Sequence, residues 1–390
     1  MKLFLSLLCM LLLAQAAFCT NYTVNNEQAL RELVPKLQAG DKVLIAEGTY
    51  TPWAITLNTQ GTQKLPVIIE AATPGKVIFT GTATQPIFKL TGSYTILKGI
   101  HFNNCTILRE GKQPGVLVEM NNTKHCRLTA CTFYQNIAKS QYLPLVIVGG
   151  PGEYNTVDNC LFSGNIDNQD VQVKVTKENA PHYTLIEKNK FENKAPVSWT
   201  NNNGGECIQI GQDPVLLGHF YTNTTVRNNK FIRCKGEPEV ISNKCSNNYY
   251  RDNYFEDCDG ELVMRGGHDC IIENNTIVGG NCGIRVNGTG HIIQGNKITN
   301  VKTGIRLMYG MVKHKGEVGF YVAASDCVVK NNKIENTQTA IFVGDAKNVD
   351  WRGKFDTIRY PSRVMQDVAP YNNTLVNNKF KQNGTTVVEQ

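Results

Sequence analysis

The segment TTVRNNKFIRC, which begins at Thr224, is followed by two variants of itself: NYYRDNYFEDC from Asn248 and CIIENNTIVGG from Cys270. Each copy has a β-rich stretch, an Asn near a turn, and then an aromatic residue or Ile that starts another short strand. Further copies begin at Asn155, Tyr183, His291, Cys327 and Thr374. A repeat of about 20 to 50 residues is typical of solenoids and propellers, so we interpret the chain as a repeat protein.

The length of the repeat indicates which solenoid it is. Successive copies recur at a nearly constant spacing near the short end of that range, as the positions of Asn229, Asn253, Asn275 and Asn296 show. Short strands with frequent turns fit one coil of a parallel β-helix, whereas the LxxLxL frame of leucine-rich repeats is missing. Wider gaps, from residue 189 to 229 and from 296 to 332, indicate inserted loops. We therefore predict an all-β chain that forms a single right-handed parallel β-helix.

The composition agrees with this fold. The chain has 41 Asn and 34 Gly among 390 residues, and both residues are unfavourable inside helices, which disfavours a helical bundle. A hydrophobic fraction of 41% and a net charge of only +7 disfavour disorder. Asn tolerates the left-handed backbone conformation of tight corners, and stacked Asn amides can bond to one another. We expect most of the asparagines to be architectural.

The N-terminal region has two further features. Residues 1–19 have one Lys, an apolar run and then small residues, which predicts a secretory signal peptide and an exported, periplasmic or extracellular protein formed by residues 20–390. The apolar run is shorter than the about 20 residues of a membrane span, and no second run follows, so no membrane span is expected. The segment NEQALRELVPKLQ has Leu30, Leu33 and Leu37 at helical spacing, which predicts a short helix that caps the solenoid.

Eleven cysteines remain after residue 19, and they cannot all pair within one chain. Cys234, Cys258 and Cys282 are evenly spaced at the period of the repeat, as expected for equivalent places in successive coils. We expect most of the cysteines to be buried as small apolar side chains, and one or two disulfide bonds stay possible alongside them.

The repeat is interrupted most strongly between residues 201 and 267. There, GEPEVISNK carries Glu237 and Glu239, which point to the same face if the segment is a strand. Two carboxylates and an amide oxygen suit Ca²⁺, which prefers several oxygen ligands. Lys244 follows on the next stretch, and Arg265 and His268 come about one coil later. Because residues one coil apart are neighbours on a solenoid face, we expect these polar groups to converge.

These segments, NGGECIQIG, GEPEVISNK and LVMRGG, resemble a family of β-helical polysaccharide lyases, family 6, that includes chondroitinase B and alginate lyases. The resemblance implies that Asn203, Glu237 and Glu239 bind Ca²⁺ and that Lys244 and Arg265 are catalytic. It implies substrate contacts for Arg285 and Arg306, and we add His268 to them. Two departures concern substrate choice: the family often has His where this chain has Gly266, and Arg where it has Gln209.

The favoured function is lysis of a uronate-containing anionic polysaccharide by Ca²⁺-assisted β-elimination, most simply of mannuronate-containing alginate. Lys244 would remove the C5 proton and the O4 substituent would leave. Its proton donor stays open between Arg265, His268, Tyr249, Tyr250 and water, because a guanidinium rarely releases a proton. The alternatives are dermatan sulfate, with the same chemistry, and a β-helical adhesin or carbohydrate-binding protein without activity. No nucleic-acid partner is expected, and the oligomeric state is left open.

Overall fold

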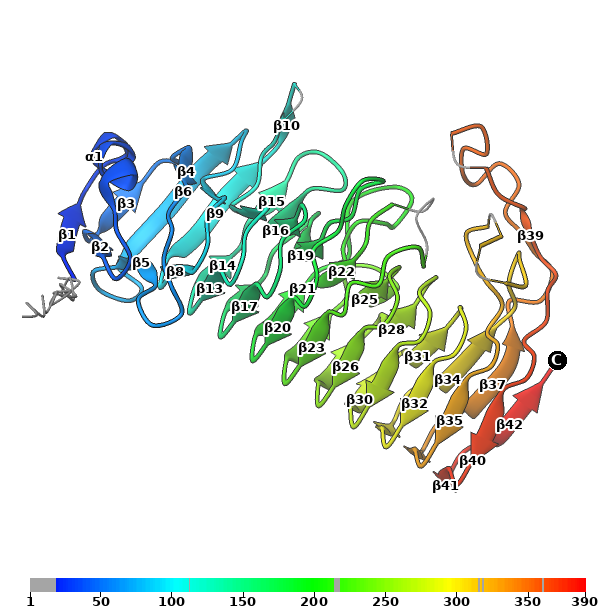
Figure 1. The fold of residues 1–390 in the computed structure, drawn as a ribbon. Coiled ribbons are helices and arrows are strands. Elements are labelled where there is room, and N and C mark those ends of the chain that lie inside the picture. Colours follow the sequence, from blue (N-terminus) through cyan, green and yellow to red (C-terminus); the bar gives the residue numbers. More distant parts are fainter. Residues whose placement is uncertain (1–18, 112, 214–217, 315, 318, 360) are drawn as a thin grey trace, which may run out of the picture.

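The computed structural model describes residues 19–111, 113–213, 218–314, 316–317, 319–359 and 361–390. Its strands form three long parallel sheets that run the length of an elongated solenoid, shown in Figure 1. From Lys42 onward, each coil contributes one strand to each sheet, in the order A, B and C, and then returns to sheet A of the next coil. The predicted all-β parallel β-helix with an N-terminal capping helix is therefore confirmed.

Sheet A runs from the N-terminal coil to the C-terminal coil, and neighbouring strands come from successive coils. Its strands are β1 (Asn21–Val24), β2 (Lys42–Ile45), β5 (Val67–Ala71), β8 (Thr95–Lys98), β13 (Arg127–Thr129), β17 (Thr156–Asp158), β20 (Leu185–Glu187), β23 (Thr225–Arg227), β26 (Tyr249–Arg251), β29 (Ile271–Glu273), β32 (Ile292–Gln294), β35 (Val328–Lys330) and β40 (Thr374–Val376). The strands are short because a corner follows each of them.

Sheet B follows sheet A in every coil. Its strands are β3 (Gly48–Tyr50), β6 (Val77–Ala83), β9 (His101–Ile107), β14 (Thr132–Tyr134), β18 (Leu161–Ser163), β21 (Lys190–Lys194), β24 (Lys230–Cys234), β27 (Tyr254–Cys258), β30 (Thr276–Gly280), β33 (Lys297–Thr299), β36 (Lys333–Glu335) and β41 (Lys379–Lys381), and β15 (Ile137–Ala138) also pairs with β9.

Sheet C completes each coil and carries the candidate site described below. Its strands are β4 (Ile55–Leu57), β7 (Phe88–Leu90), β12 (Val118–Asn121), β16 (Pro144–Gly149), β19 (Gln169–Val173), β22 (Ile208–Ile210), β25 (Glu239–Asn243), β28 (Glu261–Met264), β31 (Cys282–Val286), β34 (Thr303–Met308), β37 (Thr339–Asp345) and β42 (Thr385–Glu389). Two antiparallel pairs lie outside the three sheets: β10 (Arg109–Glu110) with β11 (Gln113–Pro114), and β38 (Val349–Asp350) with β39 (Met365–Gln366).

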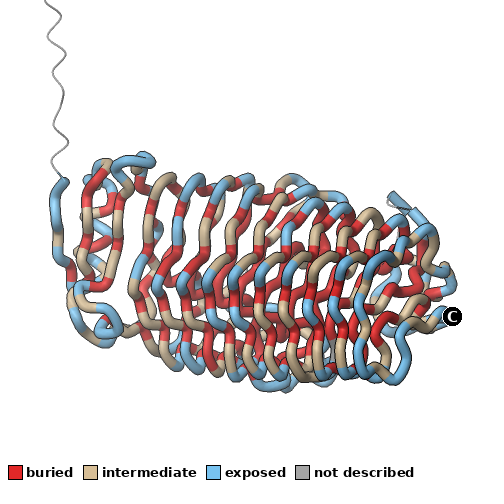
Figure 2. The backbone as a smooth tube through the Cα atoms, turned by 90° about the horizontal axis from the view of Figure 1, so that it is seen from below, coloured by how far each residue is buried: buried red, intermediate tan, exposed pale blue. Residues whose placement is uncertain are grey.

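The core lies between the three sheets, and equivalent side chains of successive coils stack on one another inside it. Figure 2 shows buried positions alternating with exposed ones along the coils. A stack of buried Phe rings passes through successive coils, with neighbouring centroids of Phe133, Phe162, Phe191, Phe231 and Phe255 4.5 to 4.9 Å apart. Parallel strands in register place like residues together, which explains why the repeat places an aromatic residue at this position.

The repeating asparagines form a buried ladder at the corner between sheets A and B. The backbone N–H and side-chain Nδ2 of Asn229 both donate to Oδ1 of Asn253, each at 3.1 Å. The same pair of bonds, at 2.9 to 3.1 Å, continues to Asn275, Asn296, Asn332 and Asn378. The left-handed corner conformation belongs instead to the residue before each ladder position, such as Asn228 (φ 56°). The two roles predicted for Asn are both present, in adjacent residues.

The N-terminal coil is covered by helix α1 (Glu27–Leu33) and the short 3₁₀ helix η1 (Val34–Lys36). The side chain of Asn26 caps α1 by accepting a bond from the backbone N–H of Ala29, at 2.9 Å. Leu30 is fully buried against the core, and Leu33 and Leu37 pack beside it. The amphipathic pattern of the sequence therefore closes this end of the solenoid, as predicted.

The cysteines whose side chains the structure describes, a set that leaves out Cys282, are free thiols, and they are buried except for Cys19. This confirms the expectation of small apolar core residues. In the described part of the chain, no helix is both long enough and apolar enough to cross a membrane.

Candidate active site

The candidate site lies on the outer face of sheet C, over strands β22, β25, β28 and β31. The parallel register places Gln209 beside Ser242, Ser242 beside Val263, and Val263 beside Arg285. Carboxylates lie at the beginning of these strands and basic residues at their ends or beyond, because each coil enters sheet C at one edge and leaves at the other. Groups that are one or more coils apart in sequence thus share one surface.

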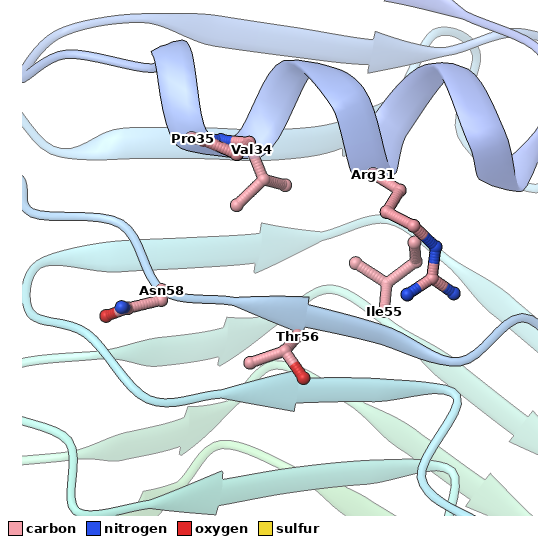
Figure 3. Close-up of a pocket in the computed structure, with 6 residues that line it drawn as sticks. All are labelled: Arg31, Val34, Pro35, Ile55, Thr56 and Asn58. Carbon is pink, nitrogen blue, oxygen red and sulfur yellow. The ribbon is translucent and has the colours of Figure 1, made fainter.

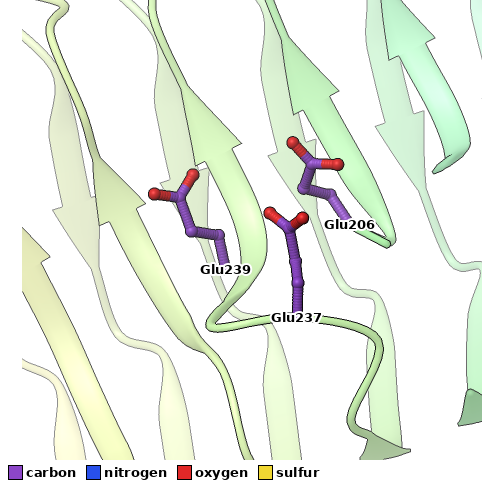
Figure 4. Close-up of side chains that lie close together, drawn as sticks. All are labelled: Glu206, Glu237 and Glu239. Carbon is purple, nitrogen blue, oxygen red and sulfur yellow. The ribbon is translucent and has the colours of Figure 1, made fainter. Parts of the chain in front are cut away.

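Three glutamates form a cluster at the edge where the chain enters this face. Glu206, Glu237 and Glu239 are buried, and one carboxylate oxygen from each lies within 4.8 Å of the others. Figure 4 shows the three carboxylates turned toward the same space, Glu206 from the segment before β22 and Glu237 from the segment before β25. Glu237 and Glu239 converge as expected, but Glu237 lies in the bend before β25 and not in the strand, and Glu206 adds a third carboxylate that the sequence reasoning missed.

Some carboxylate oxygens of the cluster accept no hydrogen bond. Among the described residues, Oε2 of Glu206 and Oε2 of Glu239 are buried without a hydrogen-bond partner. Oε1 of Glu206 accepts a bond from Gln209 at 2.5 Å, and Oε2 of Glu237 accepts bonds from the backbone N–H groups of Gly204 and Gly205. Burial and the negative charges of Glu206 and Glu239 raise the pKa of Glu237. Buried carboxylate oxygens that lie this close together and lack hydrogen-bond partners fit a hard cation such as Ca²⁺.

Asn203 lies directly before the two glycines that bond to Glu237. Its backbone carbonyl accepts a bond from Nε2 of Gln141 at 2.9 Å. The third acidic member of the cluster is Glu206. The role of Asn203 as a metal ligand stays a prediction. A signal for Glu206 was present in the sequence, because it lies directly before the segment CIQI, one coil before Glu239.

Basic side chains face the cluster from the next coils. Nη1 of Arg265 is 3.8 Å from Oε2 of Glu239, and Nη1 of Arg285 is 3.5 Å from Oε1. Although burial opposes it, the positive charges of Arg265, Arg285 and Lys244 lower the pKa of Glu239 to about 2. The carboxylate of Glu239 is therefore ionised at neutral pH.

Lys244 is buried directly after β25, and its Nζ donates to Oγ of Ser242 at 2.9 Å. Burial lowers the pKa of Lys244, and the charge of Arg265 lowers it further, against the opposite effect of the three glutamates. The pKa of Arg265 is raised, because Tyr321 and the carboxylates of the three glutamates together outweigh the lowering effect of its burial. The pair therefore combines an amine that loses its proton more easily with a guanidinium that keeps its charge.

The remaining predicted residues differ in their surroundings. Arg285 lies beside the cluster, and its Nε is buried without a partner among the described residues. Arg306 lies one coil further, where Nε donates to Glu261 at 2.9 Å and Nη1 to Asp345 at 2.7 Å. His268 is buried, with Nδ1 2.9 Å from Oγ1 of Thr289. Substrate contacts of all three stay predictions.

Two of the proposed proton donors lie elsewhere. Tyr249 and Tyr250 belong to β26 of sheet A, where Tyr250 is fully buried in the core and Tyr249 is exposed on the outer face of that sheet. Both alternatives are wrong, because neither side chain lies on the outer face of sheet C: Tyr250 points into the core, and Tyr249 points to solvent from sheet A. A tyrosine that the sequence reasoning did not consider, Tyr321, lies against both Arg265 and Arg285.

A separate pocket lies at the N-terminal end, between the capping helix and β4, and is shown in Figure 3. It is lined by Arg31, Val34, Pro35, Ile55, Thr56 and Asn58. Its one charged side chain, Arg31, pairs with Glu27 and donates to the carbonyl of Ala54 at 3.0 Å. This pocket therefore has no acidic or basic group available for the chemistry of the sheet C site.

A family model for chondroitinase B matches residues 24–389 of the chain. The chain belongs to the chondroitinase B family. It is thus a polysaccharide lyase with a parallel β-helix fold.

Solved structures of family 6 lyases have the same fold. A mannuronic acid specific family 6 lyase from human gut microbiota is 24% identical, with a TM-score of 0.78 over 95% of this chain and 83% of that chain. A family 6 lyase from Pseudopedobacter saltans is 21% identical, with a TM-score of 0.74 over 93% and 92%. A family 6 alginate lyase in complex with a trisaccharide is 20% identical, with a TM-score of 0.73 over 95% and 84%. No curated protein matches the chain.

Proposed function

We propose that this protein is a Ca²⁺-assisted alginate lyase that cleaves mannuronate-containing stretches by β-elimination. The observation that carries the proposal is the buried amine of Lys244, with its lowered pKa, on the same face as Arg265 and the three glutamates. Family membership supports the reaction class, and the family 6 alginate lyases of the same fold favour alginate as the polymer.

Lys244 is assigned the role of base. A neutral amine accepts the C5 proton of the uronate, electrons move into a new C4–C5 double bond, and the C4–O4 bond breaks. A lowered pKa increases the fraction of neutral amine near neutral pH, which is what a base of this kind requires. The hydrogen bond to Ser242 fixes the direction of the side chain.

Arg265 is assigned to charge stabilisation. Because its pKa is raised, its guanidinium stays charged and is suited to bind the uronate carboxylate and the negative charge that develops on it. The same property makes it a poor proton donor to O4, so we assign that proton to water.

Ca²⁺ would be held by Glu206, Glu237 and Glu239, with Asn203 as a further candidate ligand. When bound, the cation would neutralise the uronate carboxylate and stabilise the charge that develops beside it. Oε2 of Glu206 and Oε2 of Glu239 support this assignment, because among the described residues both are buried without a hydrogen-bond partner and Arg265 is the one cation near the second of them, at 3.8 Å.

The decisive experiment is an absorbance assay for unsaturated uronate, with alginate, polymannuronate, polyguluronate and dermatan sulfate, each with and without chelator. We expect activity on alginate and polymannuronate, a loss with chelator, and a loss of at least about a hundredfold in Lys244→Ala. Lys89→Ala, which alters a partly exposed lysine of β7 in the same sheet, is the matched control. Activity on dermatan sulfate alone would replace alginate as the substrate, and absence of activity on every polymer would reject the lyase assignment.

We also propose that the protein is exported and acts in the periplasm or outside the cell. The pattern of residues 1–19 supports this, and residues 1–18 of it lie outside the described part of the structure. Mass spectrometry of the mature N-terminus in the native host would test it, with a start at or near residue 20 expected.

A further inference from the structure

We propose that Tyr321 is a positioning residue, whose ring holds the guanidinium groups of Arg265 and Arg285 side by side against Glu239. This inference rests on the proposed function, because it concerns the geometry of the same site. It assigns to an inserted loop a role that the coils of the solenoid do not fill.

The contacts of the ring carry the inference. The Cζ atoms of Arg265 and Arg285 lie 5.6 and 5.5 Å from the centroid of the Tyr321 ring. Both guanidinium groups also face the single carboxylate of Glu239. Two cations drawn to one carboxylate repel each other, and an aromatic face in contact with both offsets part of that repulsion. The contact is strong because Tyr321 is only 3% exposed, so water does not screen it.

Tyr321 is held in place by a small structure of its own, which we call the C-terminal lobe. It consists of the described residues of two insertions, 309–326 after β34 and 346–373 after β37. Figure 1 shows both insertions, in yellow and orange, projecting beyond the coils near the C-terminal end. The lobe has a separate apolar cluster made of Met311, Val312, Phe320, Tyr321 and Val322, with Trp351 and Phe355 packed against it.

The backbone and the ring of Tyr321 are both anchored within this lobe. Its carbonyl accepts bonds from the N–H groups of Met311 at 2.7 Å and Val312 at 3.3 Å. Its ring centroid is 5.4 Å from that of Trp351, which belongs to the second insertion. Arg363 joins the two insertions by donating to the carbonyl of Met311 at 2.7 Å. The position of the ring over the arginines is therefore determined by the packing of the lobe.

The role has a direct consequence for the reaction. Lys244 and Arg265 come from coils whose backbone is fixed by sheet C, but the Arg side chains are long and flexible. Without the ring, the guanidinium groups of Arg265 and Arg285 would separate, and Arg265 would lose its place beside Glu239. A displacement of about 1 Å in a positioned group can reduce a rate by up to about a hundredfold.

The test compares Tyr321→Leu, which removes the aromatic face, with Tyr321→Phe, which keeps it and removes only the hydroxyl. We expect the Leu variant to lose roughly tenfold or more in kcat with a smaller change in KM, and the Phe variant to stay within about threefold of the unaltered enzyme. Phe355→Leu is the matched control, because Phe355 packs on Phe320 in the same lobe, with centroids 4.1 Å apart. We expect it to retain its kcat.

Three results would overturn the inference: full activity in Tyr321→Leu, an equal loss in Tyr321→Phe, or an equal loss in Phe355→Leu. The first removes any role for the ring, the second transfers the role to the hydroxyl, and the third reduces it to lobe stability. Crystal structures of the same variants provide a readout without substrate. The guanidinium groups should move away from Glu239 in the Leu variant alone, so the inference remains testable even if the protein cleaves none of the polymers.

Discussion

The amine of Lys244 is surrounded by groups that act on its pKa in opposite directions. Burial and Arg265 lower the pKa, whereas Glu206, Glu239 and Glu237 raise it, and the lowering effects dominate. A change at Arg265 should therefore be visible in the pH dependence of the reaction, separately from its effect on the rate.

We predict that Arg265→Gln moves the acidic limb of the kcat/KM profile to higher pH. The base acts in its neutral form, so activity rises with pH toward the pKa of Lys244, which lies below the ordinary value of about 10.4. Removing the neighbouring positive charge raises that pKa, so more alkaline conditions are needed for the same neutral fraction. Arg265→Lys keeps the charge and serves as the control, with a smaller displacement of the limb. If the acidic limb of the profile stays at the same pH in Arg265→Gln, the group that titrates there is not Lys244.

The carboxylate cluster leads to a prediction about metal binding. Because burial and two neighbouring carboxylates raise the pKa of Glu237, this carboxyl group holds its proton to higher pH than an ordinary glutamate does when the cation is absent. Ca²⁺ binding should then release protons, and its affinity should fall as the pH falls. Calorimetry in two buffers of different ionisation enthalpy measures the number of protons released, which we expect to be above zero.

Glu206→Gln tests the residue that the sequence reasoning missed. We expect the loss of one of three carboxylates to weaken Ca²⁺ binding by about tenfold or more, since ligand charge sets the affinity of such sites. Asn203→Ala, measured in parallel, tests the amide ligand implied by the family resemblance. Unchanged affinity in Glu206→Gln would exclude that carboxylate from the site.

At the scale of the structural elements, the Asn ladder holds the corner between sheets A and B. Each rung donates two bonds to the next coil, and its side chain also bonds to the carbonyl of the preceding coil; Nδ2 of Asn253, for example, donates to the carbonyl of Val226 at 3.0 Å. The ladder is buried, so a missing rung leaves backbone groups without water as a substitute partner.

We predict that Asn253→Ala lowers the free energy of unfolding by about 2 to 4 kcal/mol, because more than one buried polar group loses its partner. Asn281→Ala, at an exposed asparagine outside the ladder, should change it by no more than about 0.5 kcal/mol. Denaturant unfolding of both variants measures the difference. Equal stability of the two variants would contradict a structural role for the ladder.

At the scale of the whole molecule, the solenoid is closed at its N-terminal end by α1. Leu30 is fully buried beneath it, while Gln28 on the same helix faces solvent. We predict that Leu30→Ala lowers the free energy of unfolding by about 2 to 5 kcal/mol and increases aggregation, since a loosened cap uncovers strand edges. Thermal unfolding with light scattering measures both effects. Gln28→Ala should leave both nearly unchanged, and an identical response of the two variants would argue against capping by this helix.

The repeat and the apolar periodicity of the sequence by themselves determine the architecture of this protein. A short coil with one Asn and one aromatic residue in fixed places has few ways to stack, so the parallel β-helix, the ladder and the capping helix all followed from local pattern. The residues Lys244, Arg265, Glu237 and Glu239 were also identified from sequence, because they stand where the repeat is broken and match the spacing of a known family.

The tertiary structure decided which distant residues complete the site. Glu206 reaches the cluster only through the alignment of neighbouring coils, and Tyr249 and Tyr250 are excluded because their strand belongs to sheet A. Tyr321 lies more than two coils beyond Arg265 in the sequence, at the end of an irregular insertion without a repeat. Its place over the two arginines depends on the packing of one insertion against another, and no local pattern of residues encodes such a contact.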